Sequence, residues 1–410
     1  MAIDKNSMAV GHIPSLTWHR IKMNEGLVPA DYQVGGPAGT AWRLAEPAGG
    51  AGHQEPAGLG EGVTLSAVPV SLAEQELKKI APKEAPERFV AGKIPIYHPQ
   101  SFGTGLGAEL DEALIASDPE ADLVDVAAGT EVSRPIKLTV TAREGRAQAA
   151  AQVLHMGAGS KAALLIESVS EGRADGSESG GRSILTVSTR IVMDEGAELT
   201  LVKAQTLGED FLSLDDLGVS MAAGAKLDLV VAELGAAQSF RGIQVEQNGE
   251  DAVLTGSMGY LAAREQKVDI NYNVIQRGKR TQSTMNFDGV LAGKGEKSFR
   301  GTIDFRNGAV GAFGDEQENV LLLSPDIVNK TLPVILCEEE DVEGRHGATV
   351  GRLSEDMLFY MASRDIDEKT AEQIMVRARL GAVVRRIPDE EMSERLMEFV
   401  EEAFADESLS

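Results

Sequence analysis

Gly196-Ala-Glu-Leu-Thr-Leu-Val202 and Gly224-Ala-Lys-Leu-Asp-Leu-Val230 share one local pattern, and this pattern decides the fold class. A glycine is followed by two small or charged residues and then by a short apolar run, which is typical of a tight turn leading into a β-strand. Gly159 and Gly249 open similar segments. The intervals between the glycines at 159, 196, 224 and 249 are 37, 28 and 25 residues. A loose repeat of this kind predicts a β-solenoid, whose coils bury their apolar faces by stacking.

The strand-like region runs from about residue 126 to 345 and contains no helical periodicity. A β-sandwich is the alternative architecture, because it uses similar strands with frequent turns. The flanks differ in pattern. We expect residues 1–125 to be mostly helix and loop, with helices at 17–24 and 71–80 and a Gly/Ala/Pro-rich linker at 36–63. We expect residues 346–410 to be helical, with helices beginning near Ser354, Asp367 and Pro388.

Composition excludes several classes of function. The 410 residues include 39 basic and 64 acidic side chains, for a formal charge of −25, so the surface repels nucleic acid and anionic lipid. Cys337 is the only cysteine, which rules out an internal disulfide and fits a reducing compartment. The N-terminus lacks the apolar run of a signal peptide, and no stretch approaches the length of a membrane span. We therefore expect a cytoplasmic protein with no membrane or nucleic-acid partner.

Motifs of nucleotide chemistry are missing. The chain has no Gly-x-x-x-x-Gly-Lys-Ser/Thr loop, so we expect no nucleotide bound and no ATP hydrolysis in this chain. The segment Gly103–Gly107 reads Gly-x-Gly-x-Gly, but no strand–helix–strand unit surrounds it.

The segment Cys337-Glu-Glu-Glu-Asp-Val-Glu-Gly-Arg-His346-Gly347 stands out chemically. It combines the single thiol with carboxylates and an imidazole, the groups that bind iron or zinc. If the segment is a strand, residues 337, 339, 341 and 343 share one side, and His346 joins them through a bend at Gly344. The structural alternative is a buried cysteine beside a solvated acidic turn.

The residues that follow resemble a known family. His346-Gly-Ala-Thr-Val-Gly351, then Leu353, Leu358-Phe-Tyr360 and Ser363-Arg364, with Pro333 upstream, is similar to the C-terminal signature of SufB/SufD iron–sulfur cluster assembly proteins. Asp365 stands where the family has glycine. Thr17-Trp18 and Lys22-Met-Asn24 resemble the N-terminal segment of some members.

The resemblance implies a right-handed parallel β-helix flanked by helical N- and C-terminal regions. It further implies a scaffold that is not itself an enzyme. Two such chains, identical or homologous, pair to form a dimer. A SufC-type ABC ATPase docks on the C-terminal helices and hydrolyses ATP, and a transient iron–sulfur cluster is built with sulfur from a cysteine desulfurase route.

The resemblance also implies roles for some residues of this sequence. His346 matches a histidine at the nascent-cluster interface, whereas Gly344 and Gly347 replace the cysteine of SufD-like and the glutamate of SufB-like members. Our hypothesis is that Cys337, Glu343 and His346 contribute to an interfacial iron–sulfur site, with Cys337 and His346 as metal ligands. The simpler alternative uses His346 alone, or a partner chain richer in ligands. The expected ATPase anchor, with ordinary helix packing as its alternative, comprises Met357, Phe359, Tyr360 and Met361.

Two other functions compete with the scaffold. A carbohydrate-active β-helix enzyme needs carboxylates or arginines along a groove, and the aromatic content of 4% is low for a sugar platform. A purely structural β-helix would leave the His346 motif and the helical ends unexplained.

Overall fold

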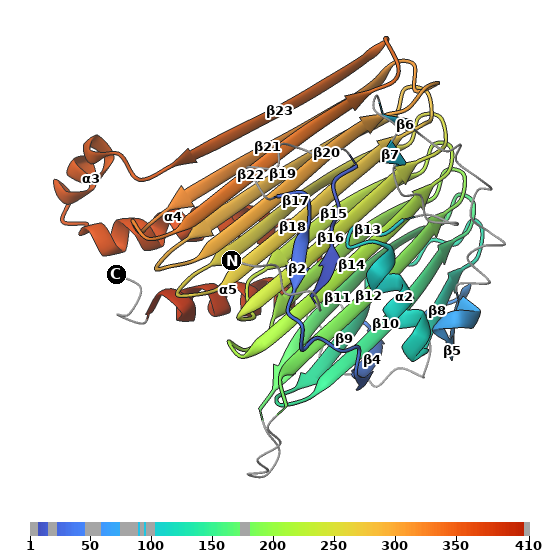
Figure 1. Cartoon of the computed structure of the whole chain (residues 1–410), viewed down its shortest axis with the longest axis horizontal. Coiled ribbons are helices and arrows are strands. Elements are labelled where there is room, and N and C mark those ends of the chain that lie inside the picture. The colour runs from blue at the N-terminus through green and yellow to red at the C-terminus, as the bar shows by residue number, and fades with distance from the viewer. Residues whose placement is uncertain are drawn as a thin grey trace.

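A β-solenoid of about eight turns forms the body of the protein (Figure 1). The computed structural model describes residues 7–14, 23–45, 59–73, 89–90, 94–95, 103–172 and 181–405. Each strand of the repeat pairs in parallel with the strand two positions later in the chain, so the chain winds between two sheets. This arrangement confirms the predicted solenoid over the sandwich, because sandwiches are built from antiparallel sheets.

The two sheets are named here sheet I and sheet II. The parallel strands of sheet I are β8 (Glu120–Val126), β10 (Ala147–Met156), β12 (Ser183–Met193), β14 (Phe211–Met221), β16 (Gln238–Gln247), β18 (Lys267–Gln276), β20 (Glu296–Phe305) and β22 (Val328–Cys337). Those of sheet II are β9 (Ile136–Arg143), β11 (Lys161–Glu171), β13 (Glu198–Thr206), β15 (Lys226–Glu233), β17 (Val253–Ala262), β19 (Gln282–Leu291), β21 (Ala312–Leu322) and β23 (Val342–Gly351).

The glycines of the sequence pattern lie in the turns between the sheets. Gly196 and Gly224 have φ of 67° and 64°, the left-handed region that residues with a Cβ rarely adopt. The apolar run that follows each of them begins the next strand, β13 or β15. The repeat seen in the sequence is therefore a repeat of turn geometry.

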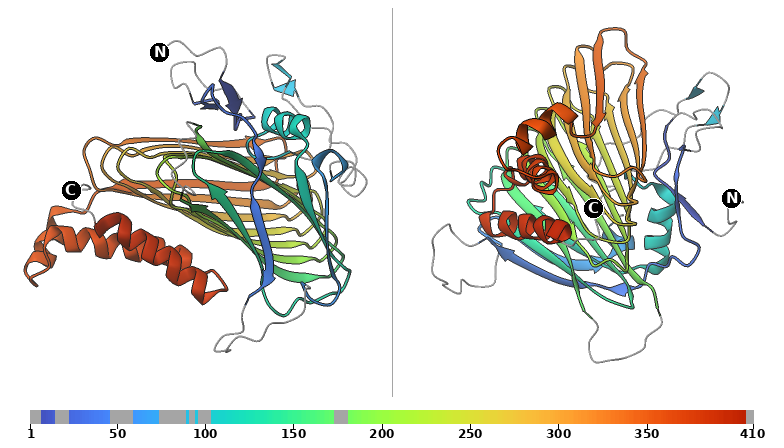
Figure 2. Two further views of the ribbon diagram at one scale, coloured as in Figure 1. Left: turned by 90° about the horizontal axis from the view of Figure 1, so that it is seen from below. Right: turned by 90° about the vertical axis from the view of Figure 1, so that its left-hand side faces the viewer.

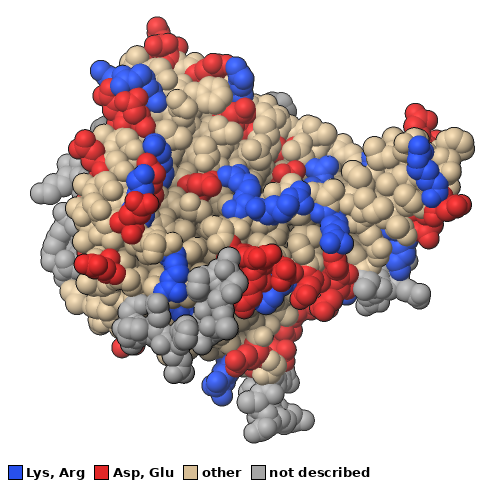
Figure 3. Space-filling model, turned by 180° about the vertical axis from the view of Figure 1, so that it is seen from behind, with Lys and Arg blue, Asp and Glu red and all other residues tan. Residues whose placement is uncertain are grey.

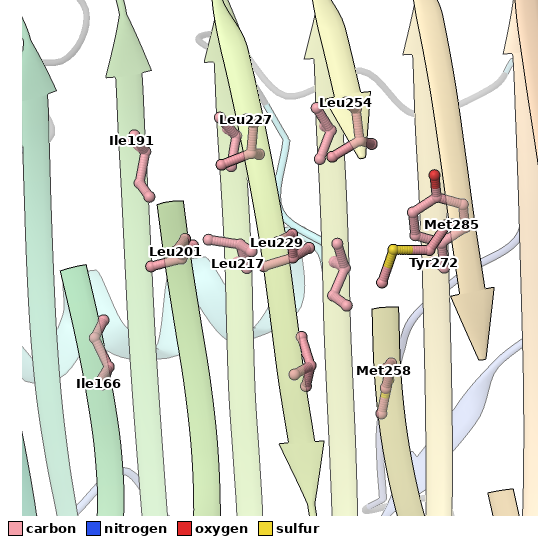
Figure 4. Close-up of a cluster of buried hydrophobic side chains, with 14 of the residues drawn as sticks. Ile166, Ile191, Leu201, Leu217, Leu227, Leu229, Leu254, Met258, Tyr272 and Met285 are labelled. Carbon is pink, nitrogen blue, oxygen red and sulfur yellow. The ribbon is translucent and has the colours of Figure 1, made fainter. Parts of the chain in front are cut away.

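The space between the sheets is filled by a continuous apolar core, shown in part in Figure 4. Leu201, Leu229 and Met258 of sheet II and Leu217 and Tyr272 of sheet I are among its members, each at most 1% exposed. Burial of such side chains is the main force that stacks the coils, at about 25 cal/mol per Å² of apolar surface removed from water.

Helices α4 (Glu368–Val384) and α5 (Glu390–Ala405) cover the outer face of sheet II (Figure 2). Met392, Leu396 and Val400 of α5 are buried there. Ion pairs join the helices to the sheet, with Arg395 of α5 bound to Glu167. Basic and acidic side chains accordingly lie next to each other on the face seen in Figure 3.

The N-terminal region lies against the outer face of sheet I (Figure 2). It contains α2 (Ala108–Ser117), β1 (Met8–Val10) and β2 (Gly26–Val28). The segment Gly103–Gly107, here called the strap, contacts sheet I closely because a Cβ at Gly105 would lie 1.9 Å from the backbone nitrogen of Ile243. The Gly-x-Gly-x-Gly pattern thus serves close backbone packing. Farther out, β6 (Phe89–Val90) pairs with β7 (Ile94–Pro95).

Strands outnumber helices in the described part of residues 1–125, whereas we expected mostly helix and loop there. The linker predicted at 36–63 is wrong for residues 36–45, which form β3 (Gly36–Pro37) and β4 (Gly39–Leu44). These pair with β10 and β9 because Trp42 and Leu44 pack on the solenoid core. Residues 46–58 lie outside the described residues, as does most of the helix predicted at 17–24. Residues 70–73 are helical, but 74–80 of the second predicted helix are again outside.

The boundary predicted at 345/346 falls inside β23, so the helical region begins later than expected. It opens with α3 (Glu355–Ala362), where the Ser354 side chain accepts a hydrogen bond from the Met357 N–H at 3.2 Å. The side chain of Asp367 caps α4 in the same way, through the Thr370 N–H at 2.7 Å.

No helix in the described part of the chain combines the length and apolarity that a membrane span requires.

Candidate functional site at the open end of the solenoid

The C-terminal end of the solenoid exposes two long strand edges. Among the strands that the structure describes, β22 pairs only with β20, and β23 only with β21. Figure 1 shows β23 at the margin of the described part of the molecule. An edge of ten residues leaves a row of backbone N–H and C=O groups available to another chain. All residues predicted to bind a cluster lie on or beside these two strands.

Cys337 is the last residue of β22 and its side chain is exposed. It lies in register with Phe305 of β20, whose ring belongs to the apolar core between the sheets. Because register partners in stacked strands point to the same side, the thiol lies on the inner side of the open coil. The cysteine is thus available at the open end, and the buried structural cysteine considered as an alternative is not observed.

His346 lies in β23, also on the inner side and exposed. Two residues earlier, a Cβ at Gly344 would contact Phe305 and Ile335 at 2.9 and 3.1 Å, which places residue 344 on the inner side. Residue 346 follows it by the two-residue strand period. Its register partner is Glu316 of β21.

Glu343 lies on the opposite side of β23 from His346. Its carboxylate forms an ion pair with Arg345, whose guanidinium lies 5.4 Å from the centre of the Phe313 ring. The segment from 337 to 343 is not one strand, since β22 ends at Cys337 and β23 begins at Val342. The sequence-based expectation that these carboxylates share one side with the thiol is therefore wrong for Glu343.

Cys337 and His346 both lie on the inner side of the open coil, but at different positions along the strand direction. The Glu316 carboxylate lies across the interior over Gly301, because a Cβ at Gly301 would be 2.2 Å from it. Gly301 is the register partner of Pro333, and Glu316 is the register partner of His346. His346 therefore lies at the same height along the strands as Pro333. Cys337 follows Pro333 by four residues, which is ~13 Å along the strand. Within the ranges that the structure describes, no three His, Cys, Asp or Glu side chains are grouped to hold a metal ion.

A cluster of buried polar side chains lies beneath the open coil. Glu318 accepts hydrogen bonds from Tyr260 Oη at 2.8 Å and Thr331 Oγ1 at 2.7 Å, and it pairs with Lys297. Burial lowers the pKa of Lys297, while the nearby Glu318 charge opposes that shift. Glu316 is 3% exposed, and burial, with the Glu318 charge, raises its pKa to about 8.

Sequence reasoning missed this cluster. The stretch 315–319 reads Asp-Glu-Gln-Glu-Asn and has the composition of a solvated loop. The only signal was its two-residue spacing, because Glu316 and Glu318 fall on the inner side of a strand that ends in apolar residues.

The predicted anchor on α3 is exposed. None of its residues is buried, and Figure 1 shows α3 projecting beyond the solenoid. Phe359 is 79% exposed, Tyr360 56% and Met357 42%, while Met361 is half-buried. Arg364 stacks on the Tyr360 ring at 3.7 Å. Ordinary helix packing was the alternative role of these residues, and it does not account for Phe359, whose side chain is exposed.

Comparison with known proteins places this fold and open end in a family. A profile described as "SUF system FeS cluster assembly, SufBD core domain" matches residues 138–379, more than half of the chain. The iron–sulfur cluster assembly protein SufD of Bacillus subtilis is 29% identical over 33% of this chain and 31% of its own length. A chloroplastic SufBD family protein of Arabidopsis thaliana is 26% identical over 40% of this chain and 30% of its own.

The SufD protein of Escherichia coli is 24% identical over 57% of this chain and 62% of its own length. The matched regions therefore span less than two thirds of each of these relatives. The profile match runs from β9 through β23 and α3 into α4, so it includes the stacked core and the open end described above. The chain belongs to the SufBD family of the SUF system of iron–sulfur cluster assembly.

Proposed function

We propose that this chain is a scaffold subunit on which a nascent iron–sulfur cluster is built, and that it does not itself hydrolyse nucleotide. The observation that carries the proposal is the family match across the solenoid core. The alternatives of a carbohydrate-active or purely structural β-helix have no comparable support.

The open end is the surface on which we expect the second chain to pair. β22 and β23 each offer an edge of ten residues, and Val328 and Val350 on them are 37% and 44% exposed. Long, partly apolar edges pair readily with other strands unless something covers them. A second copy of this chain or a SufB/SufD-type paralogue would extend both sheets and exclude water from the inner side.

Cys337 and His346 are the residues that we expect to contact the cluster as iron ligands. A thiolate and a neutral imidazole are good ligands for iron near neutral pH. Because the two lie ~13 Å apart along the strands, a site in the assembled scaffold would need ligands from the second chain. Few ligands per chain suit a cluster that is later handed to another protein. Glu343 remains a candidate only if its pairing with Arg345 is exchanged on assembly.

The exposed face of α3 is the surface that we expect to bind a SufC-type ABC ATPase. Phe359, Tyr360 and Met357 supply a compact aromatic and sulfur-containing patch, and such residues dominate the binding energy at protein interfaces. The ATPase would supply ATP hydrolysis, and a cysteine desulfurase route would supply sulfur. We place the assembly in the cytoplasm, in keeping with the single reduced cysteine.

Co-expression tests the proposal most directly. The chain is produced with a SufC-type ATPase, with and without a SufB/SufD-type paralogue, and the purified complex is reconstituted anaerobically with ferrous iron and sulfide. We expect co-purification and a visible-absorption band of an iron–sulfur cluster. Absence of both a stable ATPase complex and any cluster would refute the scaffold function.

Three variants test the separate parts of the proposal. Cys337→Ser and His346→Ala should reduce cluster yield while leaving the ATPase bound. Phe359→Ala should weaken ATPase binding by roughly tenfold or more, as loss of an aromatic anchor does, and should leave the fold intact. Undiminished cluster yield in Cys337→Ser would remove the thiol from the ligand set.

A further inference from the structure

We propose that Lys297 and Glu318 condense to form an internal isopeptide bond beneath the open end of the solenoid. The hydroxyl groups of Thr331 and Tyr260 promote the reaction. The bond is a covalent modification of the chain by itself, and it does not depend on the proposed scaffold function.

Four side chains from four strands converge on one point of the interior. The structure shows the unreacted pair, with Lys297 Nζ of β20 2.5 Å from Glu318 Oε1 of β21, and the two side chains are 0% and 1% exposed. Thr331 Oγ1 of β22 accepts a hydrogen bond from Lys297 Nζ at 2.8 Å and donates one to Glu318 Oε2 at 2.7 Å. Tyr260 Oη of β17 donates to Glu318 Oε1 at 2.8 Å. Amine and carboxyl are therefore in contact, and each carboxyl oxygen has its own hydroxyl donor.

These contacts provide a complete route for condensation. Two of the three protons on Lys297 Nζ pass in turn through the Thr331 hydroxyl to Glu318 Oε2, and Thr331 ends unchanged. Nζ uses its lone pair to form a bond with Glu318 Cδ, the bond from Cδ to Oε2 breaks, and Oε2 leaves as water. Tyr260 stabilises the charge that develops on Oε1, which becomes the amide oxygen. The reaction needs no oxidant, reductant or other reactant.

The interior favours the amide over the ion pair. Two buried charges cost several kcal/mol of desolvation each, and a neutral amide removes both charges. Burial lowers the pKa of Lys297, which favours the neutral and nucleophilic form of the amine. The rings of Phe299 and Tyr260 lie 5.6 and 5.9 Å from Nζ and form apolar walls. Groups held in contact in this way react as if at effective concentrations of about 10⁵–10⁸ M.

A second buried lysine pair in the solenoid lacks these features and serves as an internal control. Lys203 Nζ lies 2.5 Å from Asp215 Oδ1, and both side chains are buried. The other oxygen of Asp215 is bound by the guanidinium of Arg241 at 2.6 Å. Arginine stays charged and holds this carboxylate in its ionised form, so its oxygen does not leave as water. Within the described ranges, no arginine is paired with Glu318, and we expect a bond only at Lys297.

The position of the bond gives it a mechanical role. The last coil of a solenoid has a neighbouring coil on one side only, and it opens more easily than the coils inside the stack. The bond joins sheet I to sheet II directly beneath that coil and links residues 21 positions apart. Such a link restricts the unfolded chain and holds the end of the stack closed.

Mass spectrometry of the full-length chain tests the proposal. The purified protein is incubated at neutral pH and its intact mass is measured after denaturation. We expect a mass lower than that of the sequence by one water molecule. After digestion with trypsin, residues 295–300 should be recovered joined to residues 307–330. The tryptic peptides that contain Lys203 and Asp215 should be recovered separately.

Variants identify the groups that make the bond. Lys297→Met should have the full mass of its sequence. Thr331→Val and Tyr260→Phe keep the reacting pair but each lack one hydroxyl, and we expect the bond to form roughly tenfold more slowly or less in both. Thr349→Val is the matched control, because this threonine is exposed on β23. It should form the bond at the rate of the wild type.

A wild-type chain that keeps its full mass after prolonged incubation would overturn the proposal, as would cleavage by trypsin after Lys297 in all of the protein. Equal rates in Thr331→Val and the wild type would overturn the role given to the hydroxyl. Circular dichroism establishes that each variant is folded. If a variant does not fold, the intact mass and joined peptides of the wild type still decide whether the bond exists.

Discussion

The two ends of the solenoid are finished in opposite ways. At the N-terminal end, β4 runs antiparallel to β9 and β5 (Val63–Pro69) antiparallel to β8, so the chain covers its own first coil. At the C-terminal end, no strand among the described residues lies beyond the outer edges of β22 and β23. Stacked coils always leave two ends, and an uncovered end invites pairing. The difference therefore supports the proposal that a second chain pairs at the C-terminal end.

The interiors near the two ends differ as well. Trp42 and Leu138 line the covered end, where the side chains between the sheets are mostly apolar. Under the open end the interior holds Lys297, Glu316 and Glu318. The interior under the open end therefore contains charged groups where the covered end has apolar packing. The predictions below test the stability of both ends.

Removing the buried charge under the open end should have the largest effect. Lys297→Met leaves Glu318 without its counter-charge in the interior and should lower the free energy of unfolding by about 3–5 kcal/mol. Denaturant unfolding measures the loss. Leu138→Met, a volume-conserving change at the covered end, should cost less than about 1.5 kcal/mol. If the two variants lose equal stability, the contrast between the interiors does not hold.

Between the two ends, Asp216 contacts the strap, and we expect its ionisation to make the free energy of unfolding depend on pH. This buried carboxyl accepts the Leu106 N–H at 2.7 Å, and burial, with the Asp111 charge, raises its pKa to about 7 from 3.8. The folded state therefore holds a proton that the unfolded state releases near pH 4. The resulting stability is full below about pH 4 and is lost as pH rises to about 7.

Asp216→Asn keeps the acceptor and cannot ionise, so it removes this dependence. Unfolding measured from pH 4 to 8 should give a flatter profile for Asp216→Asn, with a gain over the wild type at pH 8 on the order of a few kcal/mol. Parallel profiles for the two proteins would contradict the assignment.

The stability of the covered end should depend on Trp42 of β4. Trp42→Ala removes the ring that packs on the core and the donor to Asp122, whose Oδ2 lies 2.7 Å from Trp42 Nε1. We expect a loss of about 2–3 kcal/mol in unfolding experiments. Leu65→Ala on β5, where the side chain is 43% exposed, should change stability by less than about 0.5 kcal/mol. Similar losses in both would show that β4 does not anchor this end.

The smallest effect on the fold should come from the open edge itself. Val350→Lys places a charge on β23, which should weaken pairing with a second chain by roughly tenfold while leaving the monomer folded. Val310→Lys is the matched control, because this valine is 38% exposed but lies in a turn. Sedimentation of the assembled complex compares the two. Unaltered pairing in Val350→Lys would place the second chain on another surface.

Local chemistry allowed most of the fold to be predicted. The turn glycines, the alternating runs and the capped C-terminal helices each depend on residues near one another in the chain, such as Ser354 with Met357. The linker prediction is wrong at residues 36–45 because β4 is held by distant contacts of Trp42 with the solenoid. Glycine and alanine composition alone does not reveal such contacts.

The candidate site was predictable only in part. Cys337 and His346 stand out because their side chains are chemically rare in this sequence. Glu343 was assigned to the wrong side, since the end of β22 at Cys337 was not evident from the acidic run that follows.

The sequence by itself determined that the chain is a stack of strands with helices after it, because the two-residue and 3.6-residue periods are properties of consecutive residues. Only the tertiary structure decided which end stays open and which side chains meet there. Glu316 and His346 are 30 positions apart, and the coil length that brings them into register depends on every turn between them.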